Sequence, residues 1–158
     1  MRITNYESLT EIQKKLVDEA EKVMENSYNP YSKFFVGAAL LTKNGEIITS
    51  TNVENAAYGD SICAERSAVV RANAEGHRMF KSIAIITKGE EFDTIDPSAP
   101  CGSCRGVLYE FSQIAEKNLE IIMSSTKKDK IKITSINELM PSGFGPKDLG
   151  IDVKKYQK

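Results

Sequence analysis

The segment "FFVGAALLTKNGEIITSTN", residues 34–52, restricts the possible folds of this 158-residue chain more than any other stretch. Two runs of strand-forming residues flank an Asn-Gly pair, which strongly predicts a tight hairpin turn. A helix is expected before the hairpin, over residues 9–27, because apolar residues recur there three or four positions apart. Ser8 and Glu11 have the spacing of a capping box at its start. The chain is therefore expected to begin with a helix followed by a β-hairpin.

After the hairpin, helix and strand patterns alternate, which predicts one α/β domain over residues 1–158 with a mixed sheet between helices. A second helix fits residues 63–75 and ends at Gly76, a residue typical of helix C-termini. A third helix follows Pro100. The strands expected after the hairpin are 82–87, 119–125 and 130–134, the last at an edge of the sheet, and residues 136–150 fit a helical turn followed by a loop.

The charge and hydropathy of the chain exclude several classes of protein. Its 21 basic and 22 acidic residues leave a net charge of −1, so no positive field exists to gather nucleic acid. No apolar run reaches the roughly 18 residues of a membrane span, and the N-terminus lacks the apolar core of a signal peptide. With only three cysteines, the expected location is the cytoplasm, where paired cysteines more often bind metal than form disulfides.

The three cysteines have the spacing of a metal site. Cys101 and Cys104 lie three positions apart at the start of the third helix, so both sulfurs can face one point, and Cys63 begins the second helix. Three thiolates at two helix N-termini can form three corners of a tetrahedron around zinc. The only histidine, His77, lies a full helix length from Cys63, so the fourth corner is left for water. An open corner is the arrangement of catalytic zinc sites.

Charged residues next to the cysteines fit this chemistry. Glu65 points away from the metal position, but its long side chain can reach a metal-bound water, whose pKa zinc lowers towards about 7. A carboxylate there can serve as general acid and base. Zn²⁺ with three thiolates carries a net negative charge. We therefore hypothesise that Arg66, Arg105 or both donate hydrogen bonds to cysteine sulfur.

The motifs "CAERSA" and "PCGSCR" resemble the cytidine deaminase family, of the small type with three cysteine ligands. The resemblance covers about residues 9–150 and includes "NPYSKFFVGAAL" and "TNVENAAY". The zinc motifs alone occur in many deaminases, whereas "NVENAAY" and "PSGFGPKDL" indicate the branch that acts on free nucleosides. The resemblance implies a three-layer α/β/α fold with a five-stranded mixed sheet flanked by helices.

The resemblance also implies an activity and its central residues. Cys63, Cys101 and Cys104 would bind one zinc ion per subunit, and Glu65 would carry protons between the water, ring N3 and the leaving amine. The implied reaction is hydrolytic deamination of cytidine and deoxycytidine to uridine and deoxyuridine with release of ammonia, in pyrimidine salvage.

The implied substrate contacts lie on several elements. Asn52 and Glu54 would bind the ribose hydroxyls, and their spacing of two at a strand end does place them on the same side. Phe34 would pack against the pyrimidine. The remaining positions implied by the resemblance are Ala64 and, reaching a neighbouring subunit's site in a homotetramer with shared sites, Tyr58 and Phe144. Taken singly, such phenylalanines are more often core residues, and such Asn and Glu residues are more often found in surface turns.

Gly106 departs from the family pattern, which usually has glutamine after "PCGSCR". The glycine removes an amide that could support the site. It is also expected to enlarge the space beside the site, so a deaminase of a modified cytosine nucleoside, such as blasticidin S, is an alternative. A nucleic-acid-editing deaminase is a second alternative, although the net charge argues against it. A zinc-binding module without catalysis is a third, and a structural zinc or metal-free buried thiols are the simplest interpretations of the cysteines.

Overall fold

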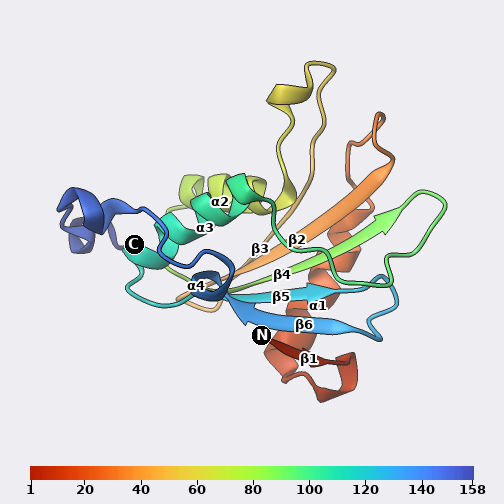
Figure 1. Ribbon diagram of the computed structural model, residues 1–158, viewed down its shortest axis with the longest axis horizontal. Helices are drawn as coiled ribbons and strands as arrows, with labels where there is room; N and C mark the ends of the chain where they lie inside the picture. The colour runs from red at the N-terminus through yellow and green to blue at the C-terminus, as the bar shows by residue number, and fades with distance from the viewer.

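The computed structural model describes residues 1–158 and shows three layers, with a mixed sheet between helices (Figure 1). The six strands have the order β1-β6-β5-β4-β2-β3. They are β1 (Arg2–Thr4), β2 (Phe34–Thr42), β3 (Ile47–Thr51), β4 (Phe80–Gly89), β5 (Glu120–Ser124) and β6 (Ile131–Ser135). The α-helices are α1 (Glu11–Met24), α2 (Ala64–Ala74), α3 (Gly102–Ile114) and α4 (Ile136–Leu139).

The sheet is antiparallel except at its centre. β2 and β3 form the predicted hairpin, and Gly45 in its turn has a φ of 92°. β2 also pairs antiparallel with β4, with Phe34 opposite Gly89. β4 and β5 are parallel, and the connection between them passes through α3. This crossover places the N-terminus of α3 at the end of β4, on the same face of the sheet as α2.

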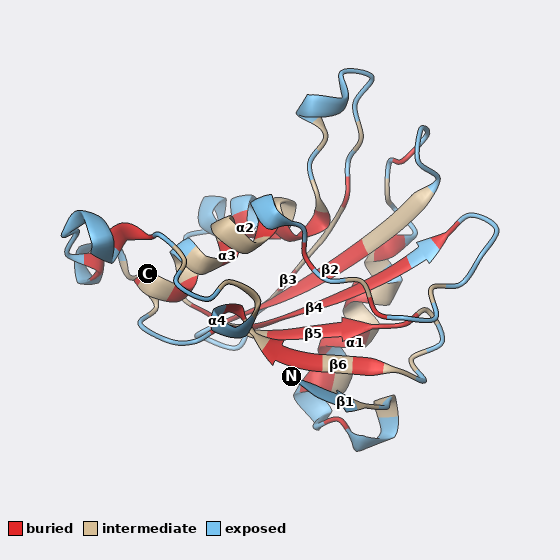
Figure 2. Cartoon of the chain, viewed as in Figure 1, coloured by how far each residue is buried: buried red, intermediate tan, exposed pale blue.

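Each face of the sheet carries its own apolar core, and the central strands are buried along most of their length (Figure 2). On one face, α2 and α3 pack over residues such as Ile83, Ile85 and Ile121. On the other face, α1 packs over β2 and β4. Gly37 of β2 permits the close approach of α1, because a Cβ there would lie 1.9 Å from the backbone oxygen of Ala20.

Two details of the fold differ from the sequence expectations. The sheet has six strands because β1 pairs antiparallel with β6, so residues 130–134 do not form an edge. A three-residue strand is too short to show a periodic pattern. The capping box of α1 is formed by Thr10 and Gln13, whereas Ser8 lies in the 3₁₀ turn Tyr6–Ser8.

The helices that carry the predicted zinc ligands begin where the sequence indicates. Cys63 is the N-cap of α2, and Cys101 is the N-cap of α3. Gly76 follows the end of α2 with a φ of 92°, as a helix-terminating glycine does. None of the helices has both the length and the apolar composition needed to cross a membrane.

Candidate active site

The sulfur atoms of Cys63, Cys101 and Cys104 lie within 4.8 Å of one another. Sγ of Cys101 is 3.9 Å from Sγ of Cys63 and 3.4 Å from Sγ of Cys104. Zn–S bonds of about 2.3 Å in tetrahedral geometry separate the sulfurs by about 3.8 Å. The donor set therefore fits one zinc ion. His77 instead lies 3.2 Å from Glu46, so the chain supplies three ligands and no fourth.

The thiols differ in how easily they lose a proton. The pKa of Cys63 is lowered to about 5, by a hydrogen bond with Cys104 and by the nearby Arg66 guanidinium. The pKa of Cys104 is raised, because its thiol is paired with Cys63 and is buried. The N-termini of α2 and α3 add positive helix-dipole ends that favour thiolate. A cation bound between the three sulfurs would favour the thiolate form of each of them.

Glu65 lies beside this cluster as the second residue of α2. Its side chain is only 5% exposed, and it lines the same cavity as Cys63 and Cys101. Burial raises the pKa of its carboxyl, and the negative charge of Cys63 adds to this effect. A carboxyl group with a raised pKa is suited to accept and release a proton near neutral pH.

A cavity of about 320 Å³ opens next to the cysteines and Glu65. This volume is at the lower end of the range for small-molecule sites, which is about 300–1,000 Å³. Phe34 and Val36 line the cavity from β2, and Asn52 and Glu54 line it from the segment after β3. The cavity therefore joins the zinc-binding cluster to four side chains from another part of the chain.

The two residues expected at the ribose also bond to the protein backbone. Asn52 Nδ2 donates to the Phe34 carbonyl at 2.9 Å, and Asn52 Oδ1 accepts from the Val36 N–H at 3.0 Å. Glu54 Oε2 accepts from the backbone N–H groups of Tyr31 and Ser32, at 3.0 and 3.2 Å. Both side chains therefore shape the wall of the cavity, and Oε1 of Glu54 has no bond within the chain.

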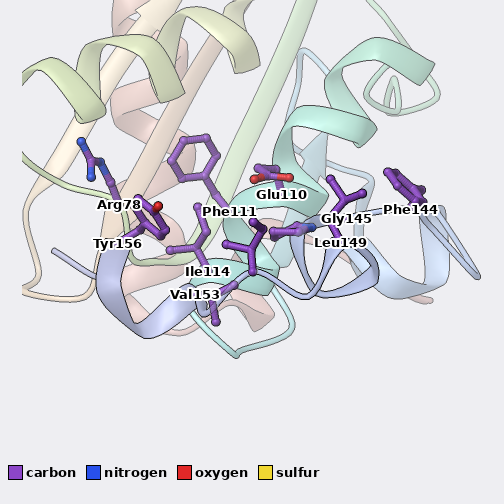
Figure 3. A pocket seen from close by; sticks show the side chains of 11 residues that line it. Arg78, Glu110, Phe111, Ile114, Phe144, Gly145, Leu149, Val153 and Tyr156 are labelled. Atoms are coloured by element: carbon purple, nitrogen blue, oxygen red, sulfur yellow. The ribbon is translucent and has the colours of Figure 1, made fainter.

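The other positions implied by the resemblance lie outside the cavity that contains Glu65. Tyr58 is 75% exposed and lines a cavity that adjoins Glu54, with its ring 5.7 Å from that of Tyr31. Phe144 is 69% exposed and lines a different, apolar cavity between α3 and the C-terminal segment (Figure 3). Ala64 is fully buried and accepts a hydrogen bond from Ser50. None of the three lines the cavity that contains Glu65.

The two arginines make different contacts. Arg105 donates to the backbone carbonyls of Pro100 and Leu139, at 2.8 and 3.1 Å, and not to a cysteine sulfur. Arg66 donates to the Ser61 carbonyl at 3.0 Å, and its Nε is buried without a partner. Of the two, only Arg66 lowers the pKa of a cysteine. The hypothesis of a hydrogen bond to sulfur is therefore retained for Arg66 alone.

Some residues of the cavity carry no signal in the sequence. Thr87 comes from the end of β4, and Ser98 and Ala99 come from the loop before α3. Thr87 is almost fully buried, and its hydroxyl lies 3.2 Å from that of Ser98. Only the crossover from β4 to α3 brings these residues to the cysteines. Gly106 does not line this cavity, and a Cβ there would meet no atom within 4 Å.

Three thiols that converge with one corner open, next to a buried carboxyl and a small cavity, define a zinc-dependent hydrolytic enzyme. Comparison with known proteins identifies the family. The model of the cytidine and deoxycytidylate deaminase zinc-binding region matches residues 10–119. The chain belongs to this family of zinc-dependent deaminases.

Individual relatives agree with this assignment. The cytidine deaminase of Sporosarcina psychrophila is 41% identical over 135 residues, which are 85% of this chain and 93% of that protein. The cytidine deaminase of Halalkalibacterium halodurans is 40% identical over 134 residues, 85% of this chain and 95% of that protein. The crystal structure of the Burkholderia pseudomallei cytidine deaminase is similar with a TM-score of 0.75 and 38% identity, covering 86% of this chain and all of that one. The three-layer fold expected from the sequence is thereby confirmed.

Proposed function

We propose that this chain deaminates cytidine and deoxycytidine to uridine and deoxyuridine, with water consumed and ammonia released. The observation that carries the proposal is a single cavity lined by two of the three clustered cysteines, by buried Glu65 and by Phe34. The relatives named as cytidine deaminases support the choice of substrate. The physiological role would be pyrimidine salvage.

In this proposal Cys63, Cys101 and Cys104 hold one zinc ion. When bound, zinc activates water as the nucleophile at neutral pH. Glu65 accepts a proton from the attacking water and delivers it to N3 of the ring. It then moves the second proton to the departing amino group, so that uridine and ammonia are formed. The burial of Glu65 keeps bulk water from competing for these protons.

The substrate would be held by side chains of the cavity wall. Phe34 packs against the pyrimidine, and the free Oε1 of Glu54 accepts a hydrogen bond from a ribose hydroxyl. Asn52 keeps one amide hydrogen for the ribose after bonding to Phe34. Ala64 would contribute through its backbone at the start of α2.

We further propose that residues 1–158 form one deaminase domain that assembles as a homotetramer with shared sites. The large exposed side chains of Tyr58 and Phe144 support this assembly, because neither side chain lines the cavity of its own chain. Both would reach a neighbouring subunit's site. A cytoplasmic location agrees with three unpaired cysteines.

The test is the ultraviolet-monitored loss of cytidine by the native chain and by Glu65→Gln, with zinc content measured in both. Gln is nearly isosteric with Glu but cannot carry the proton. We expect native turnover, and a loss of activity of at least about a hundredfold in Glu65→Gln at full zinc occupancy. Zinc bound without turnover of cytidine by the native chain would contradict the proposed substrate. Full activity in Glu65→Gln would contradict the proton transfer.

Substrate competition tests the alternative of a modified cytosine nucleoside. Gly106 does not line the cavity, so its open space on α3 lends this alternative no direct support. A preference for blasticidin S over cytidine that disappears in Gly106→Gln would nevertheless favour it.

A further inference from the structure

Phe92 lies in the connection between β4 and α3, outside the motifs that indicate the family. Its ring is paired with that of Phe34, with 6.3 Å between the ring centroids and 30° between their planes. Phe92 does not itself line the cavity, whereas Phe34 does. Phe92 therefore lies beside the ring of a residue that forms part of the cavity wall.

The strand register explains how Phe92 reaches this position. Gly89 lies directly opposite Phe34 in the antiparallel β2–β4 pair, and directly opposite side chains share one face of a sheet. Gly89 has no side chain, and the N–H of Gly89 donates to the Phe92 carbonyl at 2.9 Å, which closes a tight turn. A Cβ on Gly89 would lie 2.2 Å from Cε1 of Phe92. The ring of Phe92 thus occupies the space that a side chain on Gly89 would need.

Other contacts fix the loop that carries Phe92. The Glu90 N–H donates to the Lys33 carbonyl at 2.9 Å, directly before β2. Thr94 Oγ1 donates to the Thr87 carbonyl at 2.7 Å, and the Thr94 N–H donates to Thr126 Oγ1 at 2.8 Å. Phe92 is therefore held between two anchored residues, although its own side chain is 59% exposed.

We propose that Phe92 is a positioning residue of the substrate site, which holds the Phe34 ring against the base. This inference rests on the proposed function, in which Phe34 packs against the pyrimidine. Phe92 touches no reacting atom, so it acts equally on bound substrate and transition state. Such uniform binding appears in KM and leaves kcat unchanged.

The test compares KM and kcat for cytidine in Phe92→Ala and in variants that keep the ring. We expect KM to rise about three- to tenfold in Phe92→Ala with kcat unchanged. This rise corresponds to the loss of the interaction free energy of one aromatic pair. Phe92→Tyr should restore the native KM, because the exposed ring leaves room for a hydroxyl. Ile95→Ala is the matched control, since Ile95 lies in the same loop and is 82% exposed. Gly89→Ala should displace the ring without deleting it and raise KM like Phe92→Ala.

A native KM in Phe92→Ala would overturn the inference, as would an equal rise in Ile95→Ala or a lack of rescue by Phe92→Tyr. The affinity for uridine, measured by calorimetry, should weaken in the same variants by the same factor. Nuclear Overhauser contacts between the two rings, lost in Gly89→Ala, report the pairing in the substrate-free chain. A native chain that neither turns over cytidine nor binds uridine, while these contacts are present, would contradict the proposed function and not the pairing.

Discussion

At the scale of single residues, Glu54 anchors a loop with one carboxylate oxygen and, in the proposed function, binds the ribose with the other. Its Oε2 accepts the N–H groups of Tyr31 and Ser32, which lie in the loop before Phe34. Desolvation raises the pKa of the Glu54 carboxyl, but hydrogen bonds from Ser32 and Tyr31 outweigh it, so the net pKa is lowered. The group is ionised at neutral pH, and its second oxygen faces no partner within the chain. Glu54 can therefore anchor the loop and bind a hydroxyl at the same time.

This double use predicts different effects of two substitutions. Glu54→Ala should lower stability by at most about 1 kcal/mol, because the two N–H groups that lose their acceptor are exposed and can bond to water. It should raise KM for cytidine at least tenfold. Glu54→Gln keeps one carbonyl oxygen for the loop, so its stability should be close to native while KM stays elevated. Chemical unfolding and steady-state kinetics measure the two effects. A native KM in Glu54→Ala would show that Glu54 only anchors the loop.

The residues that the sequence indicated most clearly were those with a local pattern. Cys101 and Cys104 share a helix turn, so their convergence follows from spacing alone. Cys63 comes from another helix, and only the crossover of the chain brings it within 3.9 Å of Cys101. No sequence pattern indicated Phe92, because its position depends on the absence of a side chain on Gly89.

At the scale of elements, the starts of α2 and α3 lack the usual capping side chain. Their N-cap residues, Cys63 and Cys101, make no side-chain hydrogen bond to the helix, whereas α1 has a complete capping box. A missing cap costs a helix about 1 kcal/mol. The two helices therefore give up local stability to place sulfur atoms at their positive ends, where thiolates are favoured.

The contact of α1 with β2 predicts a strong effect of one added methyl group. Gly37→Ala should destabilise the fold by about 1–3 kcal/mol, because its Cβ would overlap the Ala20 carbonyl oxygen in a packed interface. Gly106→Ala is the matched control. Its Cβ enters open space on a helix, where alanine is favoured over glycine by up to about 1 kcal/mol. Denaturant unfolding of both variants measures the difference, and equal stabilities would contradict the packing described for α1.

Two short elements near the N-terminus, β1 and the turn Tyr6–Ser8, were not predicted by sequence patterns. β1 has three residues and is recognisable only through its pairing with β6. Two capping boxes for α1 were compatible with the sequence, Ser8 with Glu11 and Thr10 with Gln13. The structure forms the second. Ser8 cannot cap α1, because it is already the last residue of the 3₁₀ turn Tyr6–Ser8, two residues before the N-cap Thr10.

At the scale of the whole molecule, the two exposed aromatic residues Phe144 and Tyr58 bear on assembly. Phe144 lies at the end of an apolar cavity of about 530 Å³, which is formed with α3 and the C-terminal segment (Figure 3). Tyr58 lies in the loop that projects from the sheet between β3 and α2. Side chains so exposed contribute little to their own fold. Their use in a neighbouring site would explain why they are apolar.

Shared sites predict complementation between two inactive variants. Glu65→Gln lacks the proton carrier, and Phe144→Ala lacks the side chain expected to reach a neighbour. A co-expressed mixture should be more active than either variant alone, because some sites then combine a native Glu65 with a native Phe144. Sedimentation velocity should show the same oligomer for all samples. A tetrameric mixture with no recovered activity would contradict shared sites.

Local sequence patterns were enough to predict the alternation of elements, the hairpin turn, the starts of α2 and α3, and the convergence of Cys101 and Cys104. These features depend on contacts between residues that are close along the chain, so periodicity and spacing reveal them. Three other features are visible only in the folded chain: the pairing of β1 with β6, the bonds from Asn52 to β2, and the position of the Phe92 ring over Gly89. These features depend on contacts between distant segments, whose free energy comes from packing and register and not from any local pattern.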